Sequence, residues 1–74
     1  MLSKSEKEIA KAMDQYHWRA WLPVQVIADE MGRHPGHLNN SLLAMNKRHL
    51  VEMTTKDGSE CYRLTSLCRS LVRA

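Results

Sequence analysis

The sequence lacks phenylalanine and has few of the residues that mark several other classes of protein. Its 74 residues include two cysteines, two prolines and three glycines. No apolar run approaches the roughly 20 residues of a membrane-spanning helix, and the opening MLSKSEKEIAK has no signal-peptide core. We therefore expect one small cytoplasmic domain without membrane contact, whose core uses methionine, tryptophan, tyrosine and aliphatic side chains.

The cysteines and histidines match no strong site pattern. Cys61 and Cys68 are seven residues apart, and secreted disulfide scaffolds of this size usually carry more cysteines, so we expect reduced thiols. His34 and His37 could share a metal, but nothing in the sequence places a third ligand. We predict no metal and no cofactor. No nucleophile stands beside an evident base, which argues against an enzyme.

Two helices separated by a short turn are predicted between residues 23 and 48. The first spans about 23–31 and ends at Gly32, because glycine adopts a left-handed cap at little cost. The second spans about 35–48 and begins with a proline, which suits the first helical position. Both carry the three- and four-residue spacing of one buried face, at Val24, Ile27, Ala28 and Met31 and at Leu38, Leu42 and Met45.

A β-hairpin is predicted over about 51–64. Asp57 and Gly58 form the pair that favours a two-residue hairpin turn. Glu52 and Arg63 then meet across the strands as an opposite-charge pair. The same register places four residues on the other face, where we expect them to be buried: Val51, Met53, Tyr62 and Leu64.

Two further helices complete the predicted order of elements. One spans about 4–17, where Ser3 and Glu6 (or Ser5 and Glu8) have capping-box spacing. Its inward residues are predicted to be Ile9, Met13 and Tyr16. The other spans about 66–73 and closes the chain.

This arrangement resembles the winged helix-turn-helix family, particularly the small modules of MarR-like and ArsR-like bacterial regulators. The resemblance covers about residues 5–73, nearly the whole chain. It rests on Ile27-Ala28-Asp29-Glu30-Met31-Gly32, Pro35, Leu38, Leu42, Met45, Leu50-Val51, Tyr62-Arg63-Leu64-Thr65 and Leu71. It implies one α+β domain over residues 1–74, with a three-helix core, a C-terminal hairpin wing and a short final helix. His49 and Cys68 stand where the family usually has glycine, and histidine tolerates the left-handed conformation better than most residues.

The resemblance implies a small bacterial or phage transcription regulator that places its second helix-turn-helix helix in the major groove of double-stranded DNA. Exposed asparagines on that helix can bind adenine. The expected base contacts are His37, Asn39, Asn40 and Leu43. The expected DNA backbone contacts are Arg33, His34, Lys47, Arg48 and Lys56.

Charge agrees with this assignment. Residues 1–31 hold four cationic side chains against five carboxylates, a net charge of −1, whereas residues 32–74 hold seven against three, a net charge of +4. The half that would face nucleic acid is therefore the positive half.

Protein binding remains an alternative function, in which the domain is an antirepressor or an adaptor in a complex without strong DNA binding. The aromatic residues that follow the first helix, and the final helix, form a surface for a partner or for a homodimer reading two half-sites. These residues are Trp18, Trp21, Leu71 and Val72.

Overall fold

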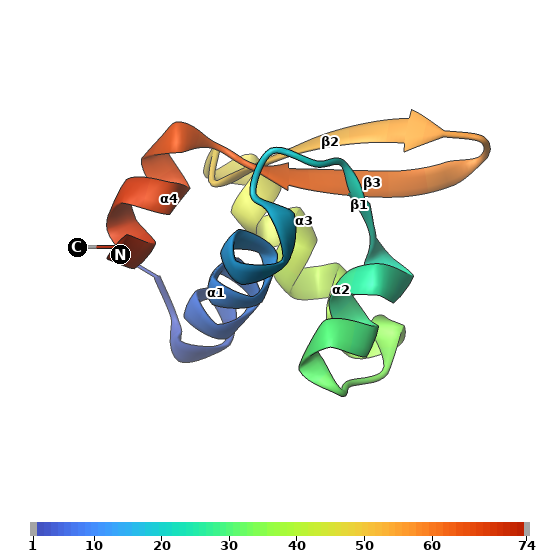
Figure 1. Ribbon diagram of the computed structural model, residues 1–74, viewed down its shortest axis with the longest axis horizontal. Helices are drawn as coiled ribbons and strands as arrows, with labels where there is room; N and C mark the ends of the chain where they lie inside the picture. Colours follow the sequence, from blue (N-terminus) through green and yellow to red (C-terminus); the bar gives the residue numbers. More distant parts are fainter. Residues whose placement is uncertain (1, 74) are drawn as a thin grey trace.

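A computed structural model describes residues 2–73, which form helices packed beneath a small sheet (Figure 1). The predicted domain also includes Met1 and Ala74, which lie outside the described residues. The elements in chain order are α1 (Lys4–His17), β1 (Leu22–Pro23), α2 (Val24–Met31), the 3-10 turn η1 (Pro35–His37), α3 (Asn39–Lys47), β2 (Val51–Lys56), β3 (Ser59–Leu64) and α4 (Ser66–Arg73). The predicted α+β layout is confirmed. None of the described helices is both long and apolar enough to cross a membrane.

Helix α1 begins at the predicted capping box. The Glu6 amide donates to Ser3 Oγ at 3.2 Å, and the Ser3 amide donates to Glu6 Oε1 at 2.9 Å. Ile9 and Met13 are buried as expected, but the prediction for Tyr16 is wrong, because its side chain is 53% exposed. The buried face of α1 ends at Met13, and no residue of the last turn is buried.

The turn between α2 and α3 follows the predicted glycine. Gly32 is left-handed with φ of 66°, and its amide donates to the carbonyls that end α2. The expected helix over 35–48 is not continuous. Residues 35–37 form a 3-10 turn, because the His37 and Leu38 amides donate to carbonyls three residues back, and α3 starts at Asn39.

The hairpin has the predicted register. Val51 pairs with Leu64 and Met53 with Tyr62, while Asp57 and Gly58 both have positive φ, as a type I′ turn requires. The Arg63 guanidinium lies 3.2 Å from the Glu52 carboxylate, as expected. The sequence reading missed β1, which pairs antiparallel with β3 and makes a three-stranded sheet of order β1-β3-β2.

One predicted core residue of the hairpin is exposed. Met53 has a 44% exposed side chain, although it shares a face with the buried Val51, Tyr62 and Leu64. The hairpin extends away from α4 toward its turn (Figure 1), and burial along β2 is complete only at Val51, its first residue. The prediction for Met53 was therefore wrong, because strand alternation predicts which face of the hairpin meets the core but not how many residues of that face the core covers.

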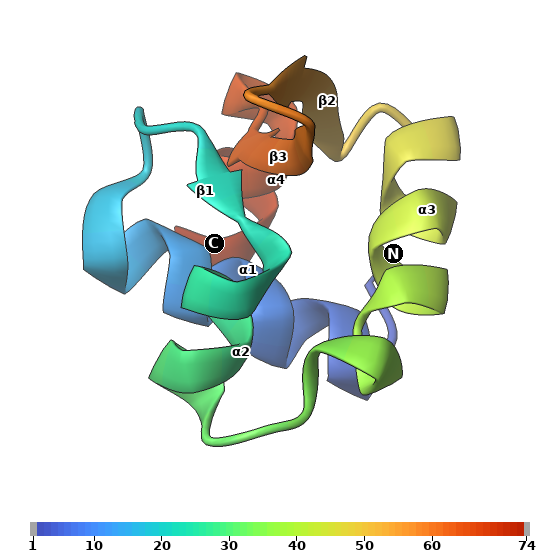
Figure 2. The ribbon, with the colours of Figure 1, turned by 90° about the vertical axis from the view of Figure 1, so that its right-hand side faces the viewer.

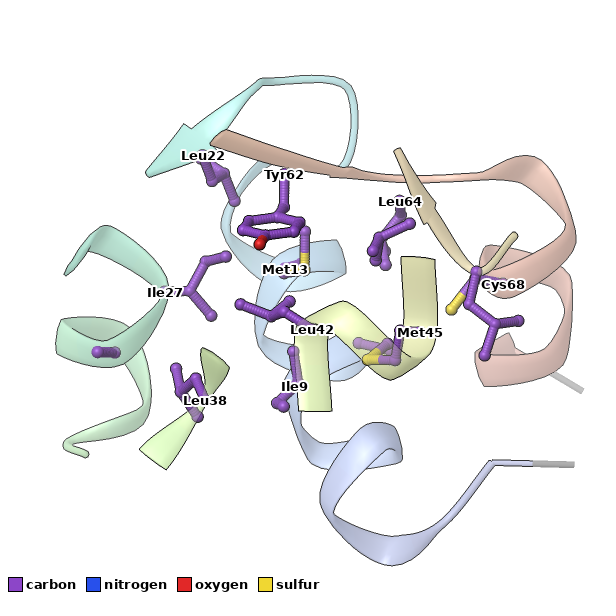
Figure 3. Close-up of a cluster of buried hydrophobic side chains, with 14 residues drawn as sticks. Ile9, Met13, Leu22, Ile27, Leu38, Leu42, Met45, Tyr62, Leu64 and Cys68 are labelled. Carbon is purple, nitrogen blue, oxygen red and sulfur yellow. The ribbon is translucent and has the colours of Figure 1, made fainter. Parts of the chain in front are cut away.

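The core joins all four helices to the sheet. Figure 3 shows side chains from α1, α2, α3, β3 and α4 converging, with Leu42 near the middle of the group. Tyr62 is the largest fully buried side chain. Both thiols, Cys61 and Cys68, are buried and free.

Leu42→Ala should lower the free energy of unfolding by about 2–5 kcal/mol, because it removes a fully buried leucine and leaves a cavity. Leu43→Ala is the matched control on the exposed side of α3, and a surface change of this kind should stay within about 0.5 kcal/mol. Urea denaturation of both variants measures the difference. Equal effects would contradict the observed orientation of α3.

Candidate nucleic-acid interface

The two faces of α3 differ sharply. Leu38, just before the helix, and Leu42 and Met45 within it are buried in the core. The side chains on the other faces are exposed: Asn39, Asn40, Leu43, Ala44 and Lys47. Figure 2 shows α3 along one side of the molecule, away from β1. Three of the four predicted base contacts, Asn39, Asn40 and Leu43, are thus exposed on one helix. The fourth, His37, is exposed in the preceding turn.

Backbone and side-chain bonds fix the end of α3 against the hairpin. The Asn46 side-chain amide donates to the Val51 carbonyl at 3.0 Å, and the Leu50 amide donates to the Met45 carbonyl at 2.8 Å. Between them, His49 has a φ of 61°. Histidine therefore fulfils the left-handed role for which the resemblance suggested glycine, and α3 cannot rotate without breaking these bonds.

A shallow cleft lies beside α3, between the start of α2 and β3. It is lined by Pro23, Val24, Gln25, Asn39, Leu43, Ser59, Glu60 and Tyr62. The Tyr62 hydroxyl donates to the Glu60 carboxylate at 3.2 Å. Burial of the ring is the main cause that raises the pKa of Tyr62, and the interaction with Glu60 is the second. The hydroxyl therefore stays protonated.

Gln25 and Ser59 are polar cleft residues that the sequence reading did not select. Each is exposed and lines the same cleft as the predicted contact Asn39. They are distant in sequence from α3, and only the tertiary structure places them there. The one available signal was a glutamine at the third residue of the predicted helix over 23–31, which is the second residue of α2.

Two predicted DNA backbone contacts form ion pairs with α1. Arg33 lies 3.3 Å from Glu8, and Arg48 lies 2.7 Å from Glu6. Lys47 and Lys56 are exposed and take part in no ion pair within residues 2–73. The positive charge of the second half is therefore partly neutralised before any ligand arrives.

The histidine pair has a local structural role. The His34 ring accepts a hydrogen bond from the Gly36 amide at 3.1 Å, and its centroid lies 5.7 Å from that of His37. Among residues 2–73, no three histidine, cysteine, aspartate or glutamate side chains are grouped as metal ligands.

Some residues of the predicted partner surface are covered by other side chains, and others are exposed. Arginines cover both tryptophans: the Arg69 guanidinium lies 3.9 Å from the Trp18 ring centroid, and that of Arg63 lies 4.2 Å from the Trp21 ring centroid. Val72 packs partly against the core. Leu71 is exposed, together with Leu67 one turn earlier, which the sequence reading left out of the contact set.

The same arrangement of helices and strands occurs in proteins of known structure. No protein-family model and no curated protein match the sequence. Solved structures do match. A MarR family protein from Bacillus stearothermophilus has a TM-score of 0.81 at 11% identity, with 97% of this chain and 49% of that chain covered. This chain has the winged helix-turn-helix fold. The hairpin of β2 and β3 is its wing, and α3 is the second helix of its helix-turn-helix.

Two regulators share the same fold. The antimony-specific transcriptional repressor AntR has a TM-score of 0.80 at 17% identity, with 96% of this chain and 62% of that chain covered. MepR, a transcription regulator of the Staphylococcus aureus multidrug efflux pump MepA, has a TM-score of 0.81 at 16% identity, with 97% and 53% covered. The winged helix described here therefore spans between about half and three fifths of the length of these three proteins.

Acid should weaken the contact between α1 and α3. The Ser3 amide, opposed by burial and assisted by Arg48, lowers the pKa of Glu6 below its ordinary value of 4.5. The ionised carboxylate thus stabilises the fold fully above the unfolded-state value near 4.5, and the contribution disappears as pH falls through the lower folded-state pKa. Denaturation at pH 7 and at several values below 4.5 should show this loss in the wild type.

The variants separate Glu6 from other carboxylates. Glu6→Gln should lack this part of the acid-induced loss of stability. Glu8→Gln should retain it, because Glu8 lies on the same helix as Glu6 but forms only an exposed ion pair with Arg33. If Glu6→Gln and the wild type lose the same stability between pH 7 and the acid end, the ionised Glu6 does not stabilise the fold.

Proposed function

We propose that this winged helix binds double-stranded DNA sequence-specifically and acts as a transcription regulator, with α3 in the major groove and the wing against the backbone. One observation carries the proposal. The inner face of α3 is held in the core, which leaves Asn39 and Asn40 exposed at its first turn. AntR and MepR, a repressor and a regulator of transcription, support the same function for this fold.

Base edges and phosphates are assigned to different side chains. Asn39 and Asn40 can each make a bidentate contact to adenine, and Leu43 and His37, which are also exposed, are assigned further base contacts. Lys47 at the end of α3 and Lys56 at the wing turn face phosphates. Arg33, His34 and Arg48 flank this surface, but their internal contacts reduce the contribution expected from each.

Two copies reading two half-sites would use α4. Leu67 and Leu71 are one turn apart and exposed, so they lie on one side of this helix. Trp18 and Trp21 contribute less to such a contact, because arginine guanidiniums already cover their rings. We infer a homodimer through α4, with recognition helices about one turn of DNA, roughly 34 Å, apart.

Docking to another protein is the second candidate. It is supported by Leu43 and Met53, each 44% exposed, and by the carboxylate of Glu60 in the cleft beside α3. Salt distinguishes the two functions. DNA binding loses affinity steeply with salt, with a slope near −0.9 per phosphate contact on logarithmic axes, whereas an apolar protein interface does not.

Substitutions of base-reading and of phosphate-binding side chains should have different effects on DNA binding. Asn39→Ala and Asn40→Ala should each cost about 1–3 kcal/mol on a preferred duplex and relax preference at one or two base pairs. Lys47→Ala and Lys56→Ala should weaken binding to all duplexes alike and make the salt slope shallower by about one unit. Titrations against selected and random duplexes at several salt concentrations measure both effects. If the wild type binds no duplex at low salt, the DNA-binding proposal is wrong and docking to another protein becomes the better candidate.

A further inference from the structure

The exposed surface of α3 has an unusual chemical composition for a groove-reading helix. From its start through the second turn, its exposed side chains are two amides and two apolar groups: Asn39, Asn40, Leu43 and Ala44. The first charged side chain is Lys47, at the last residue of the helix. Positions 39–46 hold neither a cation nor a carboxylate.

This composition matches one half of the major-groove code. Guanine presents two acceptors that are read best by arginine or lysine, and the cytosine amino group is accepted by aspartate or glutamate. Adenine is read by asparagine or glutamine, and the thymine methyl is contacted by apolar side chains. The residues present on α3 therefore suit adenine and thymine, and those that suit guanine and cytosine are missing from its first two turns.

Leu43 is the most informative of these side chains. It is 44% exposed, while the core beneath α3 is already filled by Leu42 and Met45. Leu43 follows Asn39 by four residues and Asn40 by three, so it lies beside both amides on the helix surface. A side chain that contacts adenine from position 39 or 40 thus brings Leu43 near a neighbouring base pair.

We propose that the half-site read by α3 is composed of A·T base pairs and that Leu43, with Ala44 beside it, packs against thymine methyl groups. This inference rests on the proposed DNA binding by α3. It specifies the chemistry of the ligand: adjacent adenine amino groups and thymine methyls along one face of the major groove.

The first experiment uses the wild-type protein alone. Duplexes selected from a random pool should share a core rich in A·T pairs. Each thymine of that core is then replaced singly by deoxyuridine, which removes the methyl and leaves the base pair intact. At one or two positions the affinity should fall about fourfold, the equivalent of roughly 0.8 kcal/mol for one buried methyl-sized group.

The second experiment assigns the methyl contact to a residue. Leu43→Ala should bind the thymine duplex more weakly, and the deoxyuridine replacement should then cost little further, because the partner of the methyl has been removed. Met53→Ala is the matched control, since Met53 has the same 44% exposure but lies on β2. It should retain the full methyl dependence. Circular dichroism should be used to check that both exposed-site variants are folded.

The outcomes separate the inference from the function on which it rests. Binding to a G·C-rich selected core, or binding that is indifferent to deoxyuridine at every position, overturns the A·T inference and leaves DNA binding intact. An equal methyl dependence in Leu43→Ala and the wild type also overturns it, because another residue then makes the contact. Failure to bind any duplex at low salt overturns the DNA-binding proposal itself.

Discussion

Burial of one face of α3 is the interaction on which the rest of the structure depends. Leu38, Leu42 and Met45 enter the same core as residues from α1, α2 and the sheet. Because a helix is rigid, fixing these three side chains also fixes the direction of the opposite face. A domain this small has one core, so the packing of these side chains is the main determinant of how α3 is oriented. The bond from Asn46 to the hairpin and the Glu6–Arg48 ion pair hold the end of the same helix.

Internal ion pairs reshape the charge that the sequence displays. The second half of the chain carries a net charge of +4, yet its arginines contact carboxylates elsewhere in the fold. Arg69 and Arg73 share Asp14, while Arg33 and Arg48 pair with α1. Such pairs contribute little to stability where they are exposed, but each places a carboxylate beside an arginine and so weakens the local attraction of that arginine for phosphate. In the proposed DNA complex, sequence preference would come from the exposed side chains of α3, because contacts to phosphate carry no sequence information.

The candidate site was predictable where one helix determines it. Asn39, Asn40 and Leu43 were selected because they fall between buried positions of a 3.6-residue period, and the structure exposes all three. The partners of Arg33 and Arg48 were not predictable, because the paired carboxylates lie 25 and 42 residues away. Gln25 and Ser59 were missed for the same reason, since neighbours across a cleft belong to separate elements.

Local stereochemistry, which the sequence carries by itself, determined where the chain turns and how the two strands of the hairpin pair. Gly32, His49 and the Asp57–Gly58 pair adopt left-handed conformations at the turns, and the register of the hairpin follows from its two-residue turn. Tertiary structure alone decided the pairing of β1 with β3 and the exposure of Tyr16 and Met53. Burial depends on how far neighbouring elements extend, and that distance is a property of the packed molecule rather than of any segment of its sequence.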